Sequence, residues 1–228
     1  MKAKFISLSA IAALFIFASC NKANPSNPNQ VSYRFQAINP TATVAVSNPT
    51  GNSITTPAGV MSGTINWTSG YASASEIRFD AEGTGGHVKF HSETLQKIDL
   101  FAPSSLGNIV IPTGVYDTAN FEIELASTAT DSSLLLNGMY NNTPVVFAIS
   151  GEFEIDGQLP KITITDGSSY TAVTALNLAN LTQGISSATL DAATKDSSGT
   201  ILISASSNPS IYDAMVNNLS GAEQEDFH

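Results

Sequence analysis

Residues 121–125 read Phe-Glu-Ile-Glu-Leu, and this stretch decides the fold class. Apolar Phe121, Ile123 and Leu125 alternate with the acidic Glu122 and Glu124. Successive side chains of a β-strand point to opposite faces, so this period of two predicts a strand with one buried and one solvated face.

The same alternation recurs on both sides of this stretch. Short apolar or alternating segments are separated by Gly, Pro, Asn and Asp, and they occur at 31–36, 43–46, 60–67, 77–81, 88–90, 98–100, 109–111, 134–136, 145–149, 153–155 and 162–164. Asn137-Gly138 has the composition of a hairpin turn, and Asp156-Gly157 is expected to end a strand. No helical stripe of ten residues appears before residue 172. The pattern therefore predicts a mainly β protein, an antiparallel β-sandwich spanning residues 31–221.

The pattern changes after Tyr170 and predicts a short helical C-terminal region. Val173, Leu176, Leu181 and Ile185 fit a helix loosely, and 201–203 fit a returning strand. Asn208 and Pro209 have the residue types of a helix N-cap and first turn, and Gly221 of a helix stop. Residues 222–228 are expected to be a frayed acidic tail.

The N-terminus has the organisation of an export signal. Lys2 and Lys4 precede the apolar segment 5–17, which is too short to span a bilayer stably. Ala18 and Ser19 then precede Cys20, the only cysteine of the chain. This arrangement resembles the lipobox of bacterial lipoproteins, with Phe17 where Leu is commoner. The resemblance implies a signal peptide at 1–19 and lipid attachment at Cys20; an ordinary secretory signal with a coincidental cysteine is the alternative.

Residues 20–30 contain no apolar run and are rich in Pro and Asn, so we expect a flexible tether behind the lipidated cysteine. Asn21 stands where Asp would retain an enteric lipoprotein at the inner membrane. Together these features predict a lipid anchor in the outer membrane of a Gram-negative bacterium. A periplasmic and a surface orientation are both left open.

Several segments of the body resemble a group of uncharacterised Bacteroidota lipoproteins. They are Trp67-Thr68-Ser69-Gly70, Ile77-Arg78-Phe79-Asp80-Ala81, Ile98-Asp99-Leu100-Phe101, and Ile111 to Tyr116 followed by 121–125. The resemblance covers roughly residues 60–215 and departs at Val115, where the group tends to have Thr. It implies a prealbumin-like β-sandwich behind a lipid anchor, and it implies no activity.

Charge excludes one class of partner. The chain has 9 basic and 19 acidic side chains, giving a net charge of -10. Removal of residues 1–19 takes away Lys2 and Lys4, so the mature chain would carry 9 − 2 = 7 basic groups and a net charge of -12. An acidic protein repels phosphate backbones, so we expect no nucleic-acid partner. Attachment to a membrane would have to be covalent, through the lipid on Cys20.

Two histidines of the body, His87 and His91, are candidate metal ligands. His87 and His91 lie four residues apart on a predicted strand, and a strand of that length spans about 13 Å, too far for one ion. His91 and Glu93 are closer, but two ligands do not make a site. We therefore expect no metal and no cofactor, with His87, Lys89, His91 and Glu93 on a solvated face.

Two groups of carboxylates could in principle act as a catalytic pair or bind calcium. Glu122 and Glu124 share one strand face, and Glu152, Glu154 and Asp156 share another. The sequence does not place these strands side by side, so a solvated acidic face is the expectation. Residues 191–199 lack the alternating ligands of a calcium loop.

Two further features bear on glycans. Trp67 is expected to anchor the core, since one Trp is little for a carbohydrate module whose other platforms would be tyrosines such as Tyr71 and Tyr116. Asp117-Thr118-Ala119 resembles a short O-glycosylation motif of Bacteroidota, which would place Thr118 in an exposed loop.

The sequence thus favours a non-enzymatic lipoprotein, a structural or interaction domain of the cell envelope with an envelope protein or a glycan as partner. A glycan- or ligand-binding lipoprotein for nutrient capture is the first alternative. A hydrolase with an acidic site built from Glu122, Glu124, Glu152 and Glu154 is the second.

Overall fold

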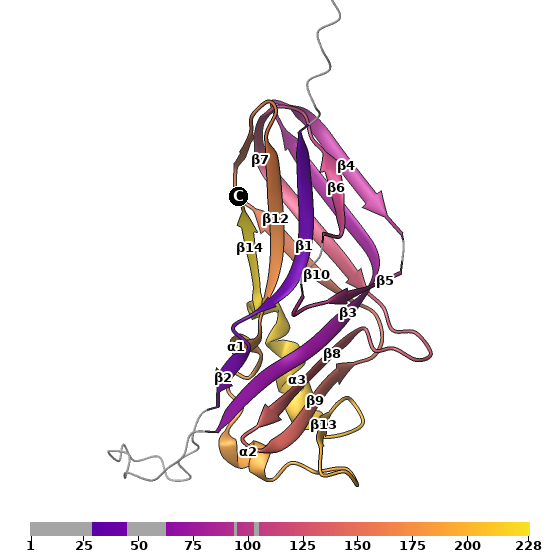
Figure 1. The fold of residues 1–228 in the computed structure, drawn as a ribbon, viewed down its shortest axis with the longest axis vertical. Helices are drawn as coiled ribbons and strands as arrows, with labels where there is room; N and C mark the ends of the chain where they lie inside the picture. Colours follow the sequence, from indigo (N-terminus) through magenta and orange to yellow (C-terminus); the bar gives the residue numbers. More distant parts are fainter. Residues whose placement is uncertain (1–28, 45–62, 94, 103–104) are drawn as a thin grey trace, which may run out of the picture.

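The computed structural model describes residues 29–44, 63–93, 95–102 and 105–228, and its alternating segments form the two sheets of a β-sandwich (Figure 1). The strands are β1 (Gln30–Ile38), β2 (Thr41–Thr43), β3 (Thr64–Gly83), β4 (Gly86–Ser92), β5 (Gln96–Asp99), β6 (Gly107–Val110), β7 (Gly114–Leu125), β8 (Leu134–Tyr140), β9 (Thr143–Ile149), β10 (Phe153–Leu159), β11 (Ile162–Ile164), β12 (Ser169–Asn177), β13 (Ile201–Ile203) and β14 (Glu223–Phe227). The short helices are α1 (Leu178–Leu181), α2 (Ser187–Asp191), α3 (Pro209–Asn217) and the 3₁₀ turn η1 (Leu219–Gly221). The prediction of a mainly β sandwich with a short helical C-terminal region is confirmed.

The smaller sheet has the strand order β14-β12-β1-β6 and lies in front in Figure 1. β12 pairs with β14 and β1 with β6 in antiparallel fashion, whereas β1 and β12 are parallel. A second parallel pair, β9 with β13, occurs in the larger sheet. Antiparallel pairs predominate, and these two parallel pairs are the addition to the expected pattern.

The larger sheet is built around β3, a single strand that contains 64–67 of the segment predicted at 60–67 and all of the segment predicted at 77–81; residues 60–62 lie outside the described residues. β8 and then β7 pair along one side of β3, and β2, β5 and β4 pair along the other. β10 and β11 continue the sheet beyond β7. The register shifts between Trp67 and Ser69 and between Ala74 and Glu76. Such irregularities bend a strand, and β3 is bent midway along its length in Figure 1.

The two sheets meet through aromatic side chains. Tyr33 of β1 stacks on Phe121 of β7 with ring centroids 4.5 Å apart, and Phe79 of β3 lies 4.7 Å from the same ring. Phe121, Ile123 and Leu125 are all buried, as their alternation predicts. This cluster is the centre of the core and fixes which face of β3 and β7 points outward.

The helices lie at the end of the larger sheet that is formed by β8, β9 and β13 (Figure 1). Ile211 and Met215 of α3 are buried, and Tyr212 packs against Phe147 of β9 with centroids 6.0 Å apart. Pro209 opens α3 as expected, but Asn208 does not cap it. Asn208 has a left-handed conformation, and its side-chain amide donates to the carbonyls of Thr194 and Leu202 instead.

Three expectations about segment boundaries are wrong. Val173 and Leu176 lie in strand β12, because a central strand covered on both faces has a continuous apolar run that resembles a helix segment. Residues 222–228 are not a frayed tail, since Glu223–Phe227 pair with β12 as β14. The domain begins before residue 31: Asn29 is buried and bonds to Thr113 and to the backbone of Gly167.

Both glycines that the sequence places in turns lie within strands. Asn137-Gly138 belongs to β8, and the turn follows at Asn141, whose φ is 52°. A Cβ on Gly138 would lie 2.6 Å from the carbonyl oxygen of Asn66, so glycine allows the close approach of β8 and β3. Gly157 likewise lies inside β10, which runs on to Leu159.

Candidate functional site

The outward side of β4, β3, β7 and β10 forms a continuous charged surface, which we call the charged face. Its inward-facing neighbours, such as Phe79 and Phe121, are buried, so strand alternation turns the charged residues to solvent. The charged face consists of Glu76, Arg78, Asp80, His87, Lys89, His91, Glu122, Glu124, Glu154 and Asp156.

Arg78 lies at the centre of this face and binds carboxylates on three strands. Its guanidinium donates to Glu76 and Glu122 and lies 3.9 Å from Glu124 and 3.8 Å from Glu154. The Arg78 hydrogen bond holds the pKa of the Glu76 carboxyl below its usual range, and Glu76 in turn raises the pKa of Arg78. One cation thus partly compensates four acids.

A second cluster on the same face centres on Asp80. His87 Nε2 and Lys89 Nζ each lie 3.0 Å from its carboxylate. Hydrogen bonds from Lys89 and then His87 hold the pKa of Asp80 below its ordinary value. This carboxylate is therefore already paired with a permanent cation.

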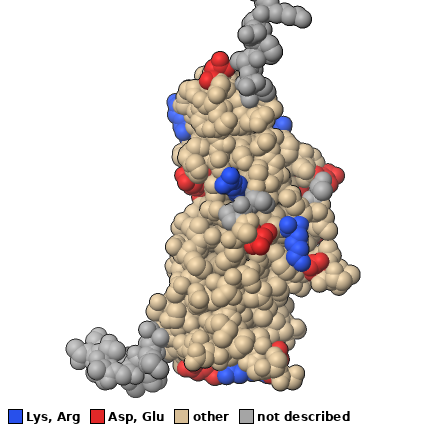
Figure 2. Space-filling model, viewed as in Figure 1, with Lys and Arg blue, Asp and Glu red and all other residues tan. Residues whose placement is uncertain are grey.

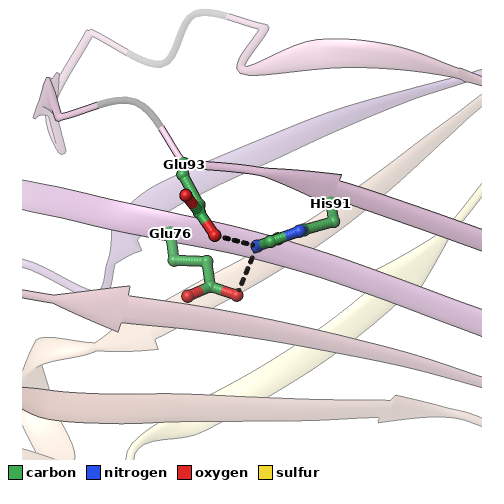
Figure 3. Close-up of side chains that lie close together, drawn as sticks. All are labelled: Glu76, His91 and Glu93. Atoms are coloured by element: carbon green, nitrogen blue, oxygen red, sulfur yellow. Dashed lines mark ion pairs between the residues drawn. The ribbon is translucent and has the colours of Figure 1, made fainter.

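Glu76, His91 and Glu93 form a third cluster at the edge of the sheet (Figure 3). His91 Nε2 lies 2.7 Å from Glu76 Oε1 and 3.4 Å from Glu93 Oε1. The side chain of Glu76 is only 13% exposed, whereas those of His91 and Glu93 are open to solvent. In the close-up one imidazole nitrogen of His91 points toward both carboxylates.

The structure brings together carboxylates that the sequence could not place side by side. β10 pairs with β7 so that Asp156 lies opposite Glu122 and Glu154 opposite Glu124. Oxygens of Glu122, Glu154 and Asp156 all lie within 4.8 Å of one another. Glu152 precedes β10 and is exposed outside this cluster.

A shallow hollow of about 330 Å³ lies on the charged face. Its polar lining comes from Arg78, Asp80, Lys89, His91, Asn120 and Glu122. Arginine, lysine and carboxylates alternate across it, so it offers paired charges to a ligand. A general acid needs surroundings that favour its protonated form, and the cation at Arg78 favours the ionised form of Glu76 instead.

Trp67 and Tyr116 offer no open platform for a glycan, whereas Tyr170 is partly exposed and stacks on Phe227 with ring centroids 5.2 Å apart. Trp67 is 2% exposed and packs in the core, which confirms that expectation. Tyr116 is fully buried. Tyr71 borders a hollow of about 460 Å³, but the Lys97 ammonium lies 3.7 Å above the centre of its ring and also contacts Asp131 at 2.6 Å.

Thr118 is exposed, as the glycosylation motif requires, but it does not lie in a loop. It is part of β7 and pairs with Glu82 of β3, next to a register shift. Asp117 beside it is exposed and lies 3.5 Å from Lys161.

A different carboxylate pair lies on β14, the edge strand of the smaller sheet, next to β10. Glu225 Oε2 accepts a hydrogen bond from Thr174, whose hydroxyl also bonds to buried Tyr33. Glu225 Oε1 is buried without a hydrogen-bond partner. Burial raises the pKa of Glu225 to about 7, and burial together with Asp156 raises that of Glu223 to about 7.

The predicted signal peptide at 1–19, the predicted lipidation site Cys20 and most of the predicted tether lie outside the described residues. Within the part of the chain that is described, no helix combines the length and the apolar character needed to cross a membrane.

Comparisons of this chain with protein-family models, with curated proteins and with solved structures returned no match.

Proposed function

We propose that this chain is a lipid-anchored β-sandwich of the outer membrane that acts as a non-enzymatic interaction domain of the cell envelope. The observation that carries the anchor is the arrangement of the N-terminus: an apolar segment at 5–17, then Ala18 and Ser19, then the only cysteine of the chain. β1 begins at Gln30, so residues 21–29 separate Cys20 from the first strand. Such a spacer would let the domain stand clear of the bilayer.

The interaction role is supported by the difference between the two outer faces of the sandwich. The outward side of the smaller sheet, seen in Figure 2, carries few charged side chains on a largely uncharged surface. The larger sheet presents the charged face, where cations and carboxylates from four strands neutralise one another in part. A broad surface of alternating charges suits recognition of a partner with complementary charges, because charge pairs select partners and orientation.

The anchor is tested by mass spectrometry of the full chain expressed in a Gram-negative host and recovered from the outer-membrane fraction. We expect a chain that starts at Cys20 and carries diacylglycerol on its sulfur, held by two or three acyl chains. Cys20→Ser should abolish the modification and leave the leader uncleaved. Ser19→Gly keeps a small residue before the cysteine and should be processed normally. An unmodified Cys20 sulfur or an intact leader on the wild-type chain would refute the proposal.

The interaction surface is tested with a photo-crosslinking amino acid placed at one of two exposed asparagines. Asn120 lies on the charged face and Asn108 on the outward side of the smaller sheet. In intact cells we expect a defined crosslinked envelope component from position 120 and none from position 108. Crosslinks of equal yield from both positions, or none from position 120, would contradict the assignment of the charged face.

A further inference from the structure

We propose that Glu76, His91 and Glu93 bind a single divalent transition-metal ion, for which Zn²⁺ is the probe. This goes beyond the proposed interaction role and departs from the sequence-based expectation of no metal. His91 and Glu93 alone gave two ligands, and the pairing of β4 with β3 supplies Glu76 as the third.

The donor set suits zinc in particular. Zn²⁺ takes imidazole nitrogen and carboxylate oxygen at about 2.0–2.2 Å, and sites with three protein ligands keep a fourth position for water or another molecule. One imidazole with two carboxylates matches that ligand count. The imidazole separates this cluster from an all-oxygen group, which would suit calcium or magnesium instead.

Two of the three donor separations are close to those that a tetrahedral ion requires, and all three ligand atoms lie within 4.8 Å of one another. Two donors about 2.05 Å from such an ion lie about 3.3 Å apart. The separation of His91 Nε2 and Glu93 Oε1 is 3.4 Å, which fits without movement. His91 Nε2 and Glu76 Oε1, at 2.7 Å, must separate by roughly half an ångström, which rotation of the half-exposed imidazole can provide.

Arg78 positions the least exposed ligand. Its Nε donates to Glu76 Oε1, the oxygen that also faces His91, so this oxygen would use one lone pair for Arg78 and the other for the ion, and the carboxylate is oriented and held in its ionised form. Partners of this kind around a ligand fix its geometry and raise metal affinity. The positive charge of Arg78 itself is offset by Glu122, Glu124 and Glu154 on the far side of the guanidinium.

The two other clusters of the charged face lack this combination. At Asp80 the Lys89 ammonium occupies the place next to the carboxylate that an ion would take, 3.0 Å away. Glu122, Glu154 and Asp156 contribute oxygens only, so this cluster lacks an imidazole ligand. His87 beside Asp80 is therefore a matched control for His91: same strand, same face and a similar exposure.

The test is isothermal titration of the metal-free full chain, held in detergent, with Zn²⁺ at neutral pH. We expect one equivalent to bind with micromolar affinity. His91→Gln should weaken that binding at least about tenfold, and Glu93→Gln should weaken it less because that ligand is more exposed. His87→Gln and His228→Gln should leave the affinity unchanged. Excess Ca²⁺ should not displace the zinc, because calcium prefers oxygen ligands.

Each opposite result overturns the site. The proposal fails if the wild-type chain binds no zinc, if His91→Gln binds as tightly as wild type, or if His87→Gln loses as much affinity as His91→Gln. It also fails if Ca²⁺ displaces the ion. Circular dichroism and a melting curve of His91→Gln guard against misfolding, and absorption spectra of the Co²⁺-loaded chain provide a second readout that should change on loss of the imidazole.

Discussion

Carboxylates on the charged face and carboxylates on the edge strand β14 have pKa values that are shifted in opposite directions. On the charged face Glu76 and Asp80 lie beside cations, and their pKa values are lowered by Arg78 and by Lys89 with His87. On β14, Glu223 and Glu225 face inward, and their pKa values are raised to about 7. The residue types are similar, so the surroundings and not the composition decide the protonation state.

The difference follows from which strand lies next to each group. β3 places Arg78 among acids from two neighbouring strands, whereas β14 packs its inward side against β10, where Gly157 leaves room for the Glu225 carboxyl. β14 is an edge strand, and inward-pointing charges on edge strands discourage pairing with other chains. The charged face therefore carries carboxylates that are compensated by cations, whereas β14 carries a buried carboxyl whose pKa is about 7.

The largest expected effect on the free energy of unfolding comes from removing the aromatic contact at the centre of the core. Phe121 stacks on Tyr33 and lies opposite both Phe79 and Gly157, so it connects the charged face to the β10 side of the sandwich. Phe121→Ala should lower the free energy of unfolding by about 3–5 kcal/mol, the usual cost of truncating a buried Phe. Chemical denaturation measures it.

The control for this variant is an exposed apolar residue on the smaller sheet. Val110 is 56% exposed, and Val110→Ala should change the free energy of unfolding by about 0.5 kcal/mol or less. A loss below about 1 kcal/mol for Phe121→Ala would show that the stack does not hold the two sheets together.

The next largest effect is the pH dependence of stability that follows from the raised pKa of Glu225. A carboxyl whose pKa rises from 4.5 to about 7 on folding binds more protons in the folded state between these values. Its stabilising contribution is complete below about pH 4.5 and is lost as pH rises through about 7. The shift corresponds to about 3 kcal/mol, and because the side chain is partly exposed we expect about 1–2 kcal/mol. Glu225→Gln should remove its own share of this decline and leave the share of Glu223, as measured by denaturation from pH 4.5 to 8.

Two companion variants separate the carboxyl from general effects of charge. A Cβ on Gly157 would lie 2.2 Å from Glu225 Oε1, so Gly157→Ala should displace this carboxyl toward solvent and also flatten the decline. Glu152→Gln, at an exposed position, should leave the pH profile as it is in wild type. A profile that stays unchanged in Glu225→Gln would assign the decline to other groups.

These groups differ in how far the sequence could predict them. Alternation around Ile77, Phe79 and Phe121 predicts which residues of β3 and β7 point outward, and the structure agrees. The partners across the strands are not predictable in this way. Glu122 meets Asp156 and Arg78 because of a register that depends on the bends in β3 and on the order β10-β7-β3, which are properties of the whole fold.

The carboxyl at Glu225 was missed because the sequence of residues 222–228 has the composition of a solvated end. Its hydrogen bond to Thr174 joins residues 51 positions apart, and nothing local in the chain signals that contact. The turn predicted at Gly138 and the strand end predicted at Gly157 are wrong for a related reason. Glycine next to Asn or Asp indicates a turn, but it also serves where another strand or side chain approaches closely, and only the tertiary structure distinguishes the two uses.

The smallest expected effect on stability comes from removing the central cation of the charged face. Arg78→Met keeps an apolar stem but removes the cation from among Glu76, Glu122, Glu124 and Glu154, so these carboxylates repel one another. The lowered pKa of Glu76 stabilises the fold above its unfolded value of 4.5 and loses that effect as pH falls through its folded value. Arg78→Met should therefore melt a few degrees lower at pH 7 and approach wild type as the acids become protonated, the reverse of the trend at Glu225.

Salt gives the discriminating measurement for this variant. Repulsion among exposed carboxylates is screened within about 3 Å at 1 M ionic strength, so the difference in Tm between Arg78→Met and wild type should shrink from low salt to 1 M salt. Lys89→Met removes a cation that contacts one carboxylate instead of four, and its Tm should fall less. A lower Tm of Arg78→Met that persisted at 1 M salt would show that the arginine stabilises the sheet by packing. The charged face and β14 would then differ only in how deeply their carboxylates are buried.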